Sequence, residues 1–286
     1  MSLNEKYIYQ LLVSIESILI NCDNSRSFLT FHILCNPDIK QISLFKIKSL
    51  IKKYTNFEII CYNMGNNFMN HKNEFYSSAA YYRLLTPIFI DVDRLIYLDG
   101  DTITLKDLSD LYKNEFNDNY VLGFLDYSDC EGEIWSERYI NDGVILLNLK
   151  KIRNDKKAYD LLNMTMNNTK LKKHDQTVIN KVFYPKIGLI PFKYGIWNFQ
   201  NKFDLIDYMK RLKLELNITQ LEEALKDPGI MHNVRGWPKI WNKIYKYRYI
   251  KINGKLQKNY YFQEHYKMWH HYAKKTDYYN EMRKIF

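Results

Sequence analysis

The sequence predicts an α/β protein whose strands form a mainly parallel sheet. Two runs rich in β-branched and aromatic residues, at 29–35 and 57–62, alternate with segments 7–21 and 39–54, in which apolar residues recur at helical spacing. A third apolar run, 94–101, ends at Asp99 and Asp101 with Gly100 between them. Such a run is typical of a buried strand whose carboxyl end lies where α/β sheets bind ligands.

The rest of the chain continues this alternation. Helices are predicted over 77–85, where Pro87 follows, over 105–112 and over 150–164, and a further helix is predicted to start at Val178. The run 121–125 predicts a strand, and the Asn-rich stretch 65–76 predicts a surface loop. Asn141, Asp142 and Gly143 are expected to form a polar turn before another apolar strand.

Length and cysteine usage narrow the class of protein. The 286 residues contain no apolar stretch as long as a membrane span, and the N-terminus lacks a signal-peptide pattern, so we expect a cytoplasmic protein. The four cysteines, at 22, 35, 61 and 130, have no paired spacing. We interpret them as reduced core residues rather than as a disulfide framework or a zinc site.

The formal charge of +10 suggests a negatively charged partner: a nucleotide, a nucleic acid or an anionic membrane surface. Much of the excess lies after residue 242, where Lys and Arg are mixed with many aromatic residues. This tail is compatible with peripheral docking at the inner face of a membrane, and equally with a packed helical C-terminal lobe.

Several polar residues have two interpretations when taken singly. Asp99 and Asp101 are expected to meet solvent together after their strand, either as a simple turn or as ligands of one hard cation that holds phosphate oxygens. Arg83 is either a surface residue with a packed stem or a partner for these carboxylates and a phosphate. Asp175 is either the N-cap of the following helix or part of a site.

The order of these signals resembles the family 8 glycosyltransferases. The resemblance is carried by Leu-Asn-Glu-Lys-Tyr at 3–7, Tyr-Arg-Leu at 82–84, Leu-Asp-Gly-Asp at 98–101, Tyr-Ile-Asn-Asp-Gly at 139–143, His-Asp-Gln at 174–176 and His-Asn-Val-Arg-Gly-Trp-Pro-Lys-Ile-Trp at 232–241. It implies a GT-A fold with a nucleotide-binding sheet over residues 1–245, followed by an aromatic and basic C-terminal extension over 246–286.

The resemblance also implies the residues that would bind a divalent cation and a UDP-sugar. The metal ligands would be Asp99, Asp101 and His232, holding manganese, with magnesium as the alternative, against the diphosphate. The remaining donor-binding residues would be Asn4 and Tyr7 at the uracil, Arg83 near the sugar and phosphates, Gly100, Gly236 and Lys239 at the diphosphate, and Asn141, Asp142, Asp175 and Gln176 around the sugar. Gln176, with Asp175, would be catalytic, its carbonyl oxygen lying beneath the anomeric carbon.

The implied reaction is retaining transfer of a hexose from UDP-glucose or UDP-galactose to a hydroxyl of a glycan or lipid-linked acceptor, as in bacterial surface glycan or lipopolysaccharide synthesis. Two features depart from the family. Only three residues precede Asn4 where the family has a complete strand, which predicts either a late start or a missing central strand. The His232 motif has an extra residue before Gly236, and Ile240 stands where proline is usual.

Two other classes of protein share some of these sequence features. A haloacid dehalogenase-type phosphatase also opens with Asp-x-Asp, but Ile103 stands where that pattern has Thr or Val, and no later Gly-Asp-x-x-x-Asp follows. A nucleic-acid-binding protein would explain the charge, but no reader motif is present. We therefore expect no nucleic-acid partner.

Overall fold

The computed structural model describes residues 1–23, 28–71, 77–126, 138–167, 174–197, 218–233, 239, 241, 249–252, 255–258 and 260–286. Cys130, Gly236 and Ile240 lie outside the described residues. The chain divides into two compact units. Unit 1 comprises Met1–Ile8, Asp23–Gly100 and Leu108–Pro191, and unit 2 comprises Tyr9–Cys22, Asp101–Asp107 and Phe192–Phe286. Each unit is described by itself.

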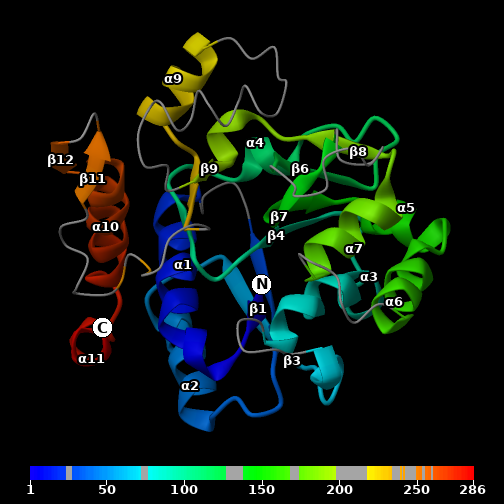
Figure 1. Ribbon diagram of the computed structural model, residues 1–286. Helices are drawn as coiled ribbons and strands as arrows, with labels where there is room; N and C mark the ends of the chain where they lie inside the picture. Colours follow the sequence, from blue (N-terminus) through cyan, green and yellow to red (C-terminus); the bar gives the residue numbers. More distant parts are fainter. Residues whose placement is uncertain are drawn as a thin grey trace. The chain divides into compact units, whose positions relative to one another are not determined.

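The first sheet of unit 1 is parallel, as the alternating pattern predicts. Its order is β1 (Ser2–Leu3), β2 (Leu29–Cys35) and β3 (Phe57–Asn63). Helix α2 (Gln41–Ser49) and the 3₁₀ turn η2 (Leu50–Lys52) connect β2 to β3 (Figure 1). The strand before Asn4 is therefore present, although it has two residues only. It leads into the 3₁₀ turn η1 (Glu5–Tyr7), which holds the N-terminal motif.

The second sheet of unit 1 is mixed and has the order β4 (Leu95–Leu98), β7 (Ile140–Leu147), β6 (Val121–Leu125) and β8 (Ile187–Leu189). The pairs β4–β7 and β7–β6 are antiparallel, and β6–β8 is parallel. The prediction of one mainly parallel sheet is thus wrong in detail, because the described strands form four sheets and the 94–101 strand pairs antiparallel. The antiparallel register, with Leu98 opposite Val144, brings the start of β7 to the end of β4.

The helices of unit 1 follow the predicted places with shifted ends. The segment predicted as a helix over 77–85 is a 3₁₀ helix, η4 (Ser78–Leu85), which continues into α3 (Thr86–Phe89). The predicted 105–112 helix is only α4 (Ser109–Tyr112), and the 65–76 loop contains a 3₁₀ turn, η3 (Met69–His71). The predicted 150–164 helix is two helices, α5 (Leu149–Asn154) and α6 (Lys157–Asn167), because Lys156 between them has a φ of 56°.

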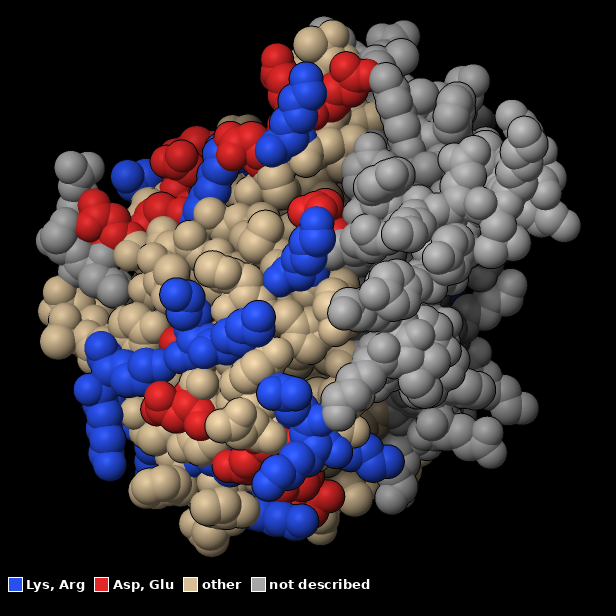
Figure 2. All heavy atoms as spheres, turned by 90° about the vertical axis from the view of Figure 1, so that its left-hand side faces the viewer, with Lys and Arg blue, Asp and Glu red and all other residues tan. Residues whose placement is uncertain are grey.

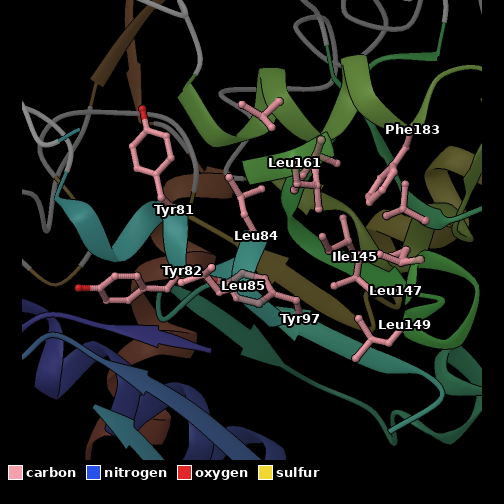
Figure 3. Close-up of a cluster of buried hydrophobic side chains, with 14 of the residues drawn as sticks. Tyr81, Tyr82, Leu84, Leu85, Tyr97, Ile145, Leu147, Leu149, Leu161 and Phe183 are labelled. Carbon is pink, nitrogen blue, oxygen red and sulfur yellow. The ribbon is translucent and has the colours of Figure 1, made fainter. Parts of the chain in front are cut away.

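A hydrophobic cluster in unit 1 lies between η4, the second sheet and the following helices. Tyr81, Tyr82, Leu84 and Leu85 of η4 belong to this cluster together with Tyr97 of β4 (Figure 3). Helix α7 (His174–Phe183) packs against β7 and η4 on the other side of the cluster. The cluster therefore joins the three elements, η4, β7 and α7, that carry the polar motifs.

Unit 2 contains a three-stranded sheet, a hairpin and four helices among its described residues. The sheet has the order β5 (Thr102–Thr104), β10 (Ile230–His232) and β9 (Ile196–Trp197). Strand β10 is antiparallel to β5 and parallel to β9. The helices are α1 (Ile8–Asn21), α9 (Ile218–Lys226), α10 (Tyr260–Ala273) and α11 (Tyr279–Ile285); the hairpin is β11 (Tyr249–Ile252) with β12 (Lys255–Lys258), and η6 (Phe192–Tyr194) is a 3₁₀ turn.

Some aromatic residues of the C-terminal segment are core residues of unit 2. Trp269 is 1% exposed, and its ring lies 6.1 Å from that of Trp241 and 6.0 Å from that of Phe286. Tyr272 is also buried and accepts a hydrogen bond from Asn21. Trp269 and Tyr272 therefore do not face a membrane, and the packed-lobe interpretation holds for them.

Two features of the described residues bear on membrane binding. No described helix has both the length and the apolar character of a membrane span. On the face shown in Figure 2, Lys and Arg side chains are interspersed with Asp and Glu. The membrane docking expected of the C-terminal extension, like the division at residue 245, stays a prediction.

Candidate active site

Four charged residues from separate elements of unit 1 meet around Arg83 of η4. We call Arg83, Asp99, Asp142 and Asp175 the Arg83 cluster. The guanidinium lies 2.9 Å from Asp99 Oδ1, 3.0 Å from Asp142 Oδ1 and 2.8 Å from Asp175 Oδ2. Asp99 directly follows β4, Asp142 lies in β7 and Asp175 lies in the first turn of α7. The antiparallel β4–β7 pairing brings the first two together, since the Asp99 amide donates to the Gly143 carbonyl.

Arg83 is a buried residue, contrary to the surface interpretation. It is 6% exposed, and its guanidinium lies over the Tyr97 ring at 4.5 Å. It also donates to the carbonyl oxygens of Ala80 and Asp142. Because every nitrogen of the guanidinium has a protein partner, Arg83 holds these elements together, and its charge is directed at carboxylates of the chain itself.

The Arg83 cluster contains more carboxyl groups than one guanidinium can neutralise. Burial raises the pKa of Asp142 well above its usual range, and Asp175 beside it adds to this effect although Arg83 opposes it. Burial also raises the pKa of Asp175. Burial would lower the pKa of Arg83, but Asp142 and Asp99 outweigh it and raise that pKa. The Asp142–Asp175 pair therefore keeps a proton to higher pH than surface carboxyls do.

A hydrogen-bonded chain of polar side chains sets the orientation of Gln176. Its Oε1 accepts from Asn141 Nδ2 at 3.2 Å, and its Nε2 donates to Asp126 Oδ2 at 2.8 Å. Asn180 ties α7 to β7, because it accepts from the Ile140 amide at 2.7 Å and donates to the Ile140 carbonyl. The amide of Gln176 is thus held in one orientation by its neighbours.

Two local predictions for these motifs are wrong. Residues 141–143 belong to β7 itself rather than to a turn before it, because the side chains of Asn141 and Asp142 find buried polar partners. Asp175 is not the N-cap of its helix, since α7 already begins at His174. Its carboxylate points to Arg83 instead.

Asp126, Asn180 and the roles of their partners were missed from the sequence. Asp126 follows the apolar strand β6 directly, as Asp99 follows β4. The same signal, a carboxylate at the end of a buried strand, could have found it.

The N-terminal motif lies in unit 1 as well. Asn4 Nδ2 donates to Ser77 Oγ at 2.9 Å, and Asn4 Oδ1 is buried without a hydrogen-bond partner among the described residues. Tyr7 is 37% exposed. Asn4 therefore has an acceptor, and Tyr7 a ring face, that a bound molecule can use.

In unit 2, Asp101 meets two basic residues from distant parts of the chain. Its Oδ1 lies 3.2 Å from His232 Nε2, and its Oδ2 lies 2.9 Å from Lys239 Nζ. We call Asp101, His232, Lys239 and Asn233 the Asp101 group. The antiparallel pairing of β10 with β5, with His232 opposite Thr102, sets this geometry. Asp101 is buried, so the expectation that it meets solvent beside Asp99, which is half-buried, is wrong.

Two basic neighbours favour the ionised form of the Asp101 carboxyl. Burial alone would raise its pKa, but Lys239 and His232 outweigh burial and hold the pKa of Asp101 well below its usual range. Lys239 Nζ also donates to the Asn233 carbonyl at 2.6 Å. The buried Asp101 carboxylate can ligate a cation. The Lys239 ammonium beside it can bind a phosphate.

Asn233 contacts Asp101, and His265 contacts Asn233. Neither residue was predicted from the sequence. Asn233 Nδ2 donates to the Asp101 carbonyl at 2.8 Å, and Asn233 Oδ1 lies 3.2 Å from His265 Nδ1. His265 lies on α10, so a helix of the predicted C-terminal extension contacts the motif residues within unit 2. Its position among aromatic residues gave no sign of this role.

The buried His265 makes stability depend on pH. Burial lowers its pKa to about 3. The unfolded chain, with a histidine pKa near 6.5, therefore binds a proton that the folded chain does not bind, and stability falls as the pH drops below about 6.5. We expect His265 to account for about 2 kcal/mol of lost unfolding free energy between pH 6.5 and pH 5.

Urea denaturation of the wild type and of His265→Gln at both pH values tests this expectation. The variant should show a shallower pH dependence by that amount. His271→Gln, at an exposed position of the same helix, is the matched control and should keep the wild-type slope. Equal slopes for the wild type and His265→Gln would contradict the assignment.

The three predicted metal ligands offer the donor atoms that a divalent cation requires. Asp99, Asp101 and His232 each offer a ligand atom and could together hold a metal ion. Two carboxylates with an imidazole fit a divalent ion such as manganese or magnesium. The donor set therefore fits the implied cation.

Comparisons with known proteins agree with the motif order. The model of "Glycosyl transferase family 8" matches residues 1–245. A lipopolysaccharide 1,2-glucosyltransferase of Escherichia coli is 27% identical over 257 residues, which cover 84% of this chain and 71% of that protein. GlyE, a glycosyltransferase of Streptococcus pneumoniae, is 26% identical over 200 residues, 68% of this chain but 47% of its own length.

Solved structures extend the likeness to the fold. The galactosyltransferase LgtC, in complex with donor and acceptor sugar analogs, matches with a TM-score of 0.66 at 17% identity, over 94% of each chain. The bifunctional WbbM matches 99% of this chain and 50% of its own, with a TM-score of 0.74 at 18% identity. These likenesses show the GT-A fold. Because the family model spans most of the sequence, the chain belongs to glycosyl transferase family 8.

Proposed function

We propose that this protein is a retaining hexosyltransferase that moves glucose or galactose from a UDP-sugar to a hydroxyl of a glycan or lipid-linked acceptor. The observation that carries the proposal is the Asp101–His232 contact of 3.2 Å. It joins two motifs that lie far apart in the sequence, in a chain whose family consists of glycosyltransferases. The lipopolysaccharide glucosyltransferase among its relatives supports a role in bacterial surface glycan synthesis.

Asp99, Asp101 and His232 would hold the divalent cation, manganese or magnesium. When bound, this ion would stabilise negative charge on the departing UDP. Lys239 would pair its ammonium with a diphosphate oxygen, since it already lies at an anionic group of the chain. Gly100 would let the backbone between the two aspartates approach the donor, because it has no side chain. Gly236, the other proposed backbone contact, lies outside the described residues.

The sugar would be held by residues of unit 1. Asn141, Asp142, Asp175 and Gln176 offer short polar groups for its hydroxyls. A contact within the chain supports the role proposed for Gln176. Its Oε1 accepts from Asn141 Nδ2, which orients this oxygen for action at the anomeric carbon. Arg83 would act by fixing Asp99 and Asp175 rather than by clamping a phosphate.

The base would bind at the N-terminal motif. Asn4 Oδ1 can accept the imide N–H of uracil, because it is a buried acceptor without a partner among the described residues. Tyr7 presents an exposed ring on which the base can stack. Neither feature is required by the phosphatase or nucleic-acid alternatives, and membership of a glycosyltransferase family gives those alternatives no support.

The test is UDP release from a panel of UDP-sugars with manganese, with magnesium and with a chelator. We expect slow release from one donor in the absence of acceptor, because water can replace the acceptor hydroxyl, and loss of release when the metal is removed. A thermal-shift titration with UDP and manganese runs beside it as a binding readout. No turnover of any donor together with no shift by UDP and manganese would contradict the proposal.

A further inference from the structure

The first residue of α7 has a backbone conformation that is uncommon for residues other than glycine. His174 has a φ of 45°, in the left-handed region that the β-carbon disfavours. It directly precedes Asp175 and Gln176, for which a role in catalysis is proposed. Residues with such strain persist where their surroundings hold them, and they are frequent at functional sites. The contacts of His174 therefore bear on the position of Gln176.

A tyrosine of η4 contacts His174. Tyr81 Oη lies 3.0 Å from His174 Nδ1, within hydrogen-bonding distance, and the two ring centroids are 6.1 Å apart. Tyr81 is buried and projects from η4 in a different direction from Tyr82, as Figure 3 shows. Two residues later, Arg83 pairs with Asp175 at 2.8 Å. Helix η4 thus holds two consecutive residues of the first turn of α7 by two separate contacts.

The ring of Tyr81 is itself fixed by aromatic neighbours. The rings of Phe68 and His71 lie 5.6 and 5.3 Å from it. His71 Nε2 lies 3.0 Å from the carbonyl oxygen of Thr165, which ties this group to α6. Phe68 has a φ of 57°, so its ring also reaches Tyr81 from a strained backbone. The Tyr81 hydroxyl is therefore presented to His174 by a ring that is packed on several sides.

The hydrogen bond opposes relaxation of the strained residue. If His174 adopted an ordinary φ, its Cβ would move and Nδ1 would leave the Tyr81 hydroxyl. The same rotation would change the direction in which the chain enters α7, and so would move Gln176. Asn141 and Asp126 orient the amide group of Gln176, whereas the contact between Tyr81 and His174 acts on the backbone that carries it.

We propose that Tyr81 and His174 are positioning residues, whose contact holds the first turn of α7 in the place from which Gln176 acts at the anomeric carbon. The inference rests on the proposed glycosyltransferase function. Loss of the contact should lower kcat roughly tenfold or more, because displacement of a reacting group is costly. The KM for the donor should change little, since the metal ligands and the N-terminal motif, which would hold UDP, are untouched.

The experiment measures UDP release by the full chain with manganese and with the donor varied. Tyr81→Phe removes the hydroxyl and keeps the ring, and His174→Ala removes its partner. His174→Asn is the conservative variant, because asparagine tolerates positive φ and its side-chain amide is bonded to Cγ as Nδ1 is. We expect the fall in kcat for Tyr81→Phe and for His174→Ala, and close to the wild-type kcat for His174→Asn. Tyr81→Phe should cause no further fall when it is added to His174→Ala.

Tyr120→Phe is the matched control. It removes a hydroxyl of unit 1 that donates to Asp155 at 2.8 Å, and it keeps the ring that is stacked on Phe183 at the other end of α7. It should retain the wild-type kcat and KM. A change in protein stability alone would not distinguish it from Tyr81→Phe, but the separation of kcat from KM does.

Hydrogen–deuterium exchange follows the first turns of α7 without any turnover. Exchange there should rise several-fold in Tyr81→Phe and His174→Ala, and should stay at the wild-type rate in His174→Asn and Tyr120→Phe. Absence of turnover in the wild type would overturn the proposed function and this inference with it. Turnover in the wild type together with an undiminished kcat in Tyr81→Phe, or with unchanged exchange in α7, would overturn this inference alone.

Discussion

Asp101→Asn is expected to reduce metal-dependent UDP release by at least about a hundredfold while the protein remains folded. Asparagine keeps the shape of the side chain and can still accept a hydrogen bond from Lys239. The Asp101 carbonyl, which accepts from Asn233, belongs to the backbone and is unchanged. The substitution removes the negative charge that a divalent cation requires.

A matched control separates loss of the ligand from loss of an ion pair. Asp227→Asn makes the same chemical change in unit 2, where Asp227 pairs with Lys106 at an exposed position. It should leave UDP release unchanged, since exposed ion pairs contribute little. Manganese binding, followed by electron paramagnetic resonance, should weaken in Asp101→Asn only. If Asp101→Asn binds manganese and releases UDP as the wild type does, Asp101 is not a metal ligand.

The elements of the fold were predictable where one physical signal dominates. The runs at 29–35 and 121–125 coincide with β2 and β6 because most residues of each run are apolar and several are β-branched or aromatic. The pairing of β4 was not predictable, because parallel and antiparallel strands share the same two-residue period. The break at Lys156 depends on one residue with positive φ, for which lysine gives no warning.

The candidate site was predictable where polar residues interrupt apolar runs. Asp99 and Asp101 stand out in the sequence because they lie at the end of a strand. The difference in their exposure could not be predicted, because Asp101 contacts Lys239 and His232, which are distant in sequence. Arg83 was ambiguous because its apolar neighbours suit a surface position and a buried one alike. His265 was hidden because a buried histidine on an aromatic-rich helix usually has a structural role.

Replacing Arg83 by methionine is expected to destabilise the protein by roughly 3–5 kcal/mol. Methionine fills much of the same volume over the Tyr97 ring, so packing is largely kept. The loss is electrostatic, because the carboxyl groups of Asp99, Asp142 and Asp175 lose their one shared cation in a buried place. Chemical denaturation at pH 7.5 measures the effect. Arg153→Met is the control, since Arg153 donates to the carbonyl oxygens of Ile90 and Val92 and should cost less.

The electrostatic origin predicts both a rescue and a pH dependence. In Arg83→Met the buried carboxyls have folded pKa values above their unfolded values, so folding favours their protonated forms, and the penalty should shrink as the pH is lowered toward 5. Adding Asp142→Asn to Arg83→Met removes one of the unpaired charges. It should recover part of the lost stability, although Asp142→Asn alone gives little gain in the presence of Arg83. A penalty that is independent of pH and unaffected by Asp142→Asn would show that Arg83 stabilises unit 1 through packing and not through its charge.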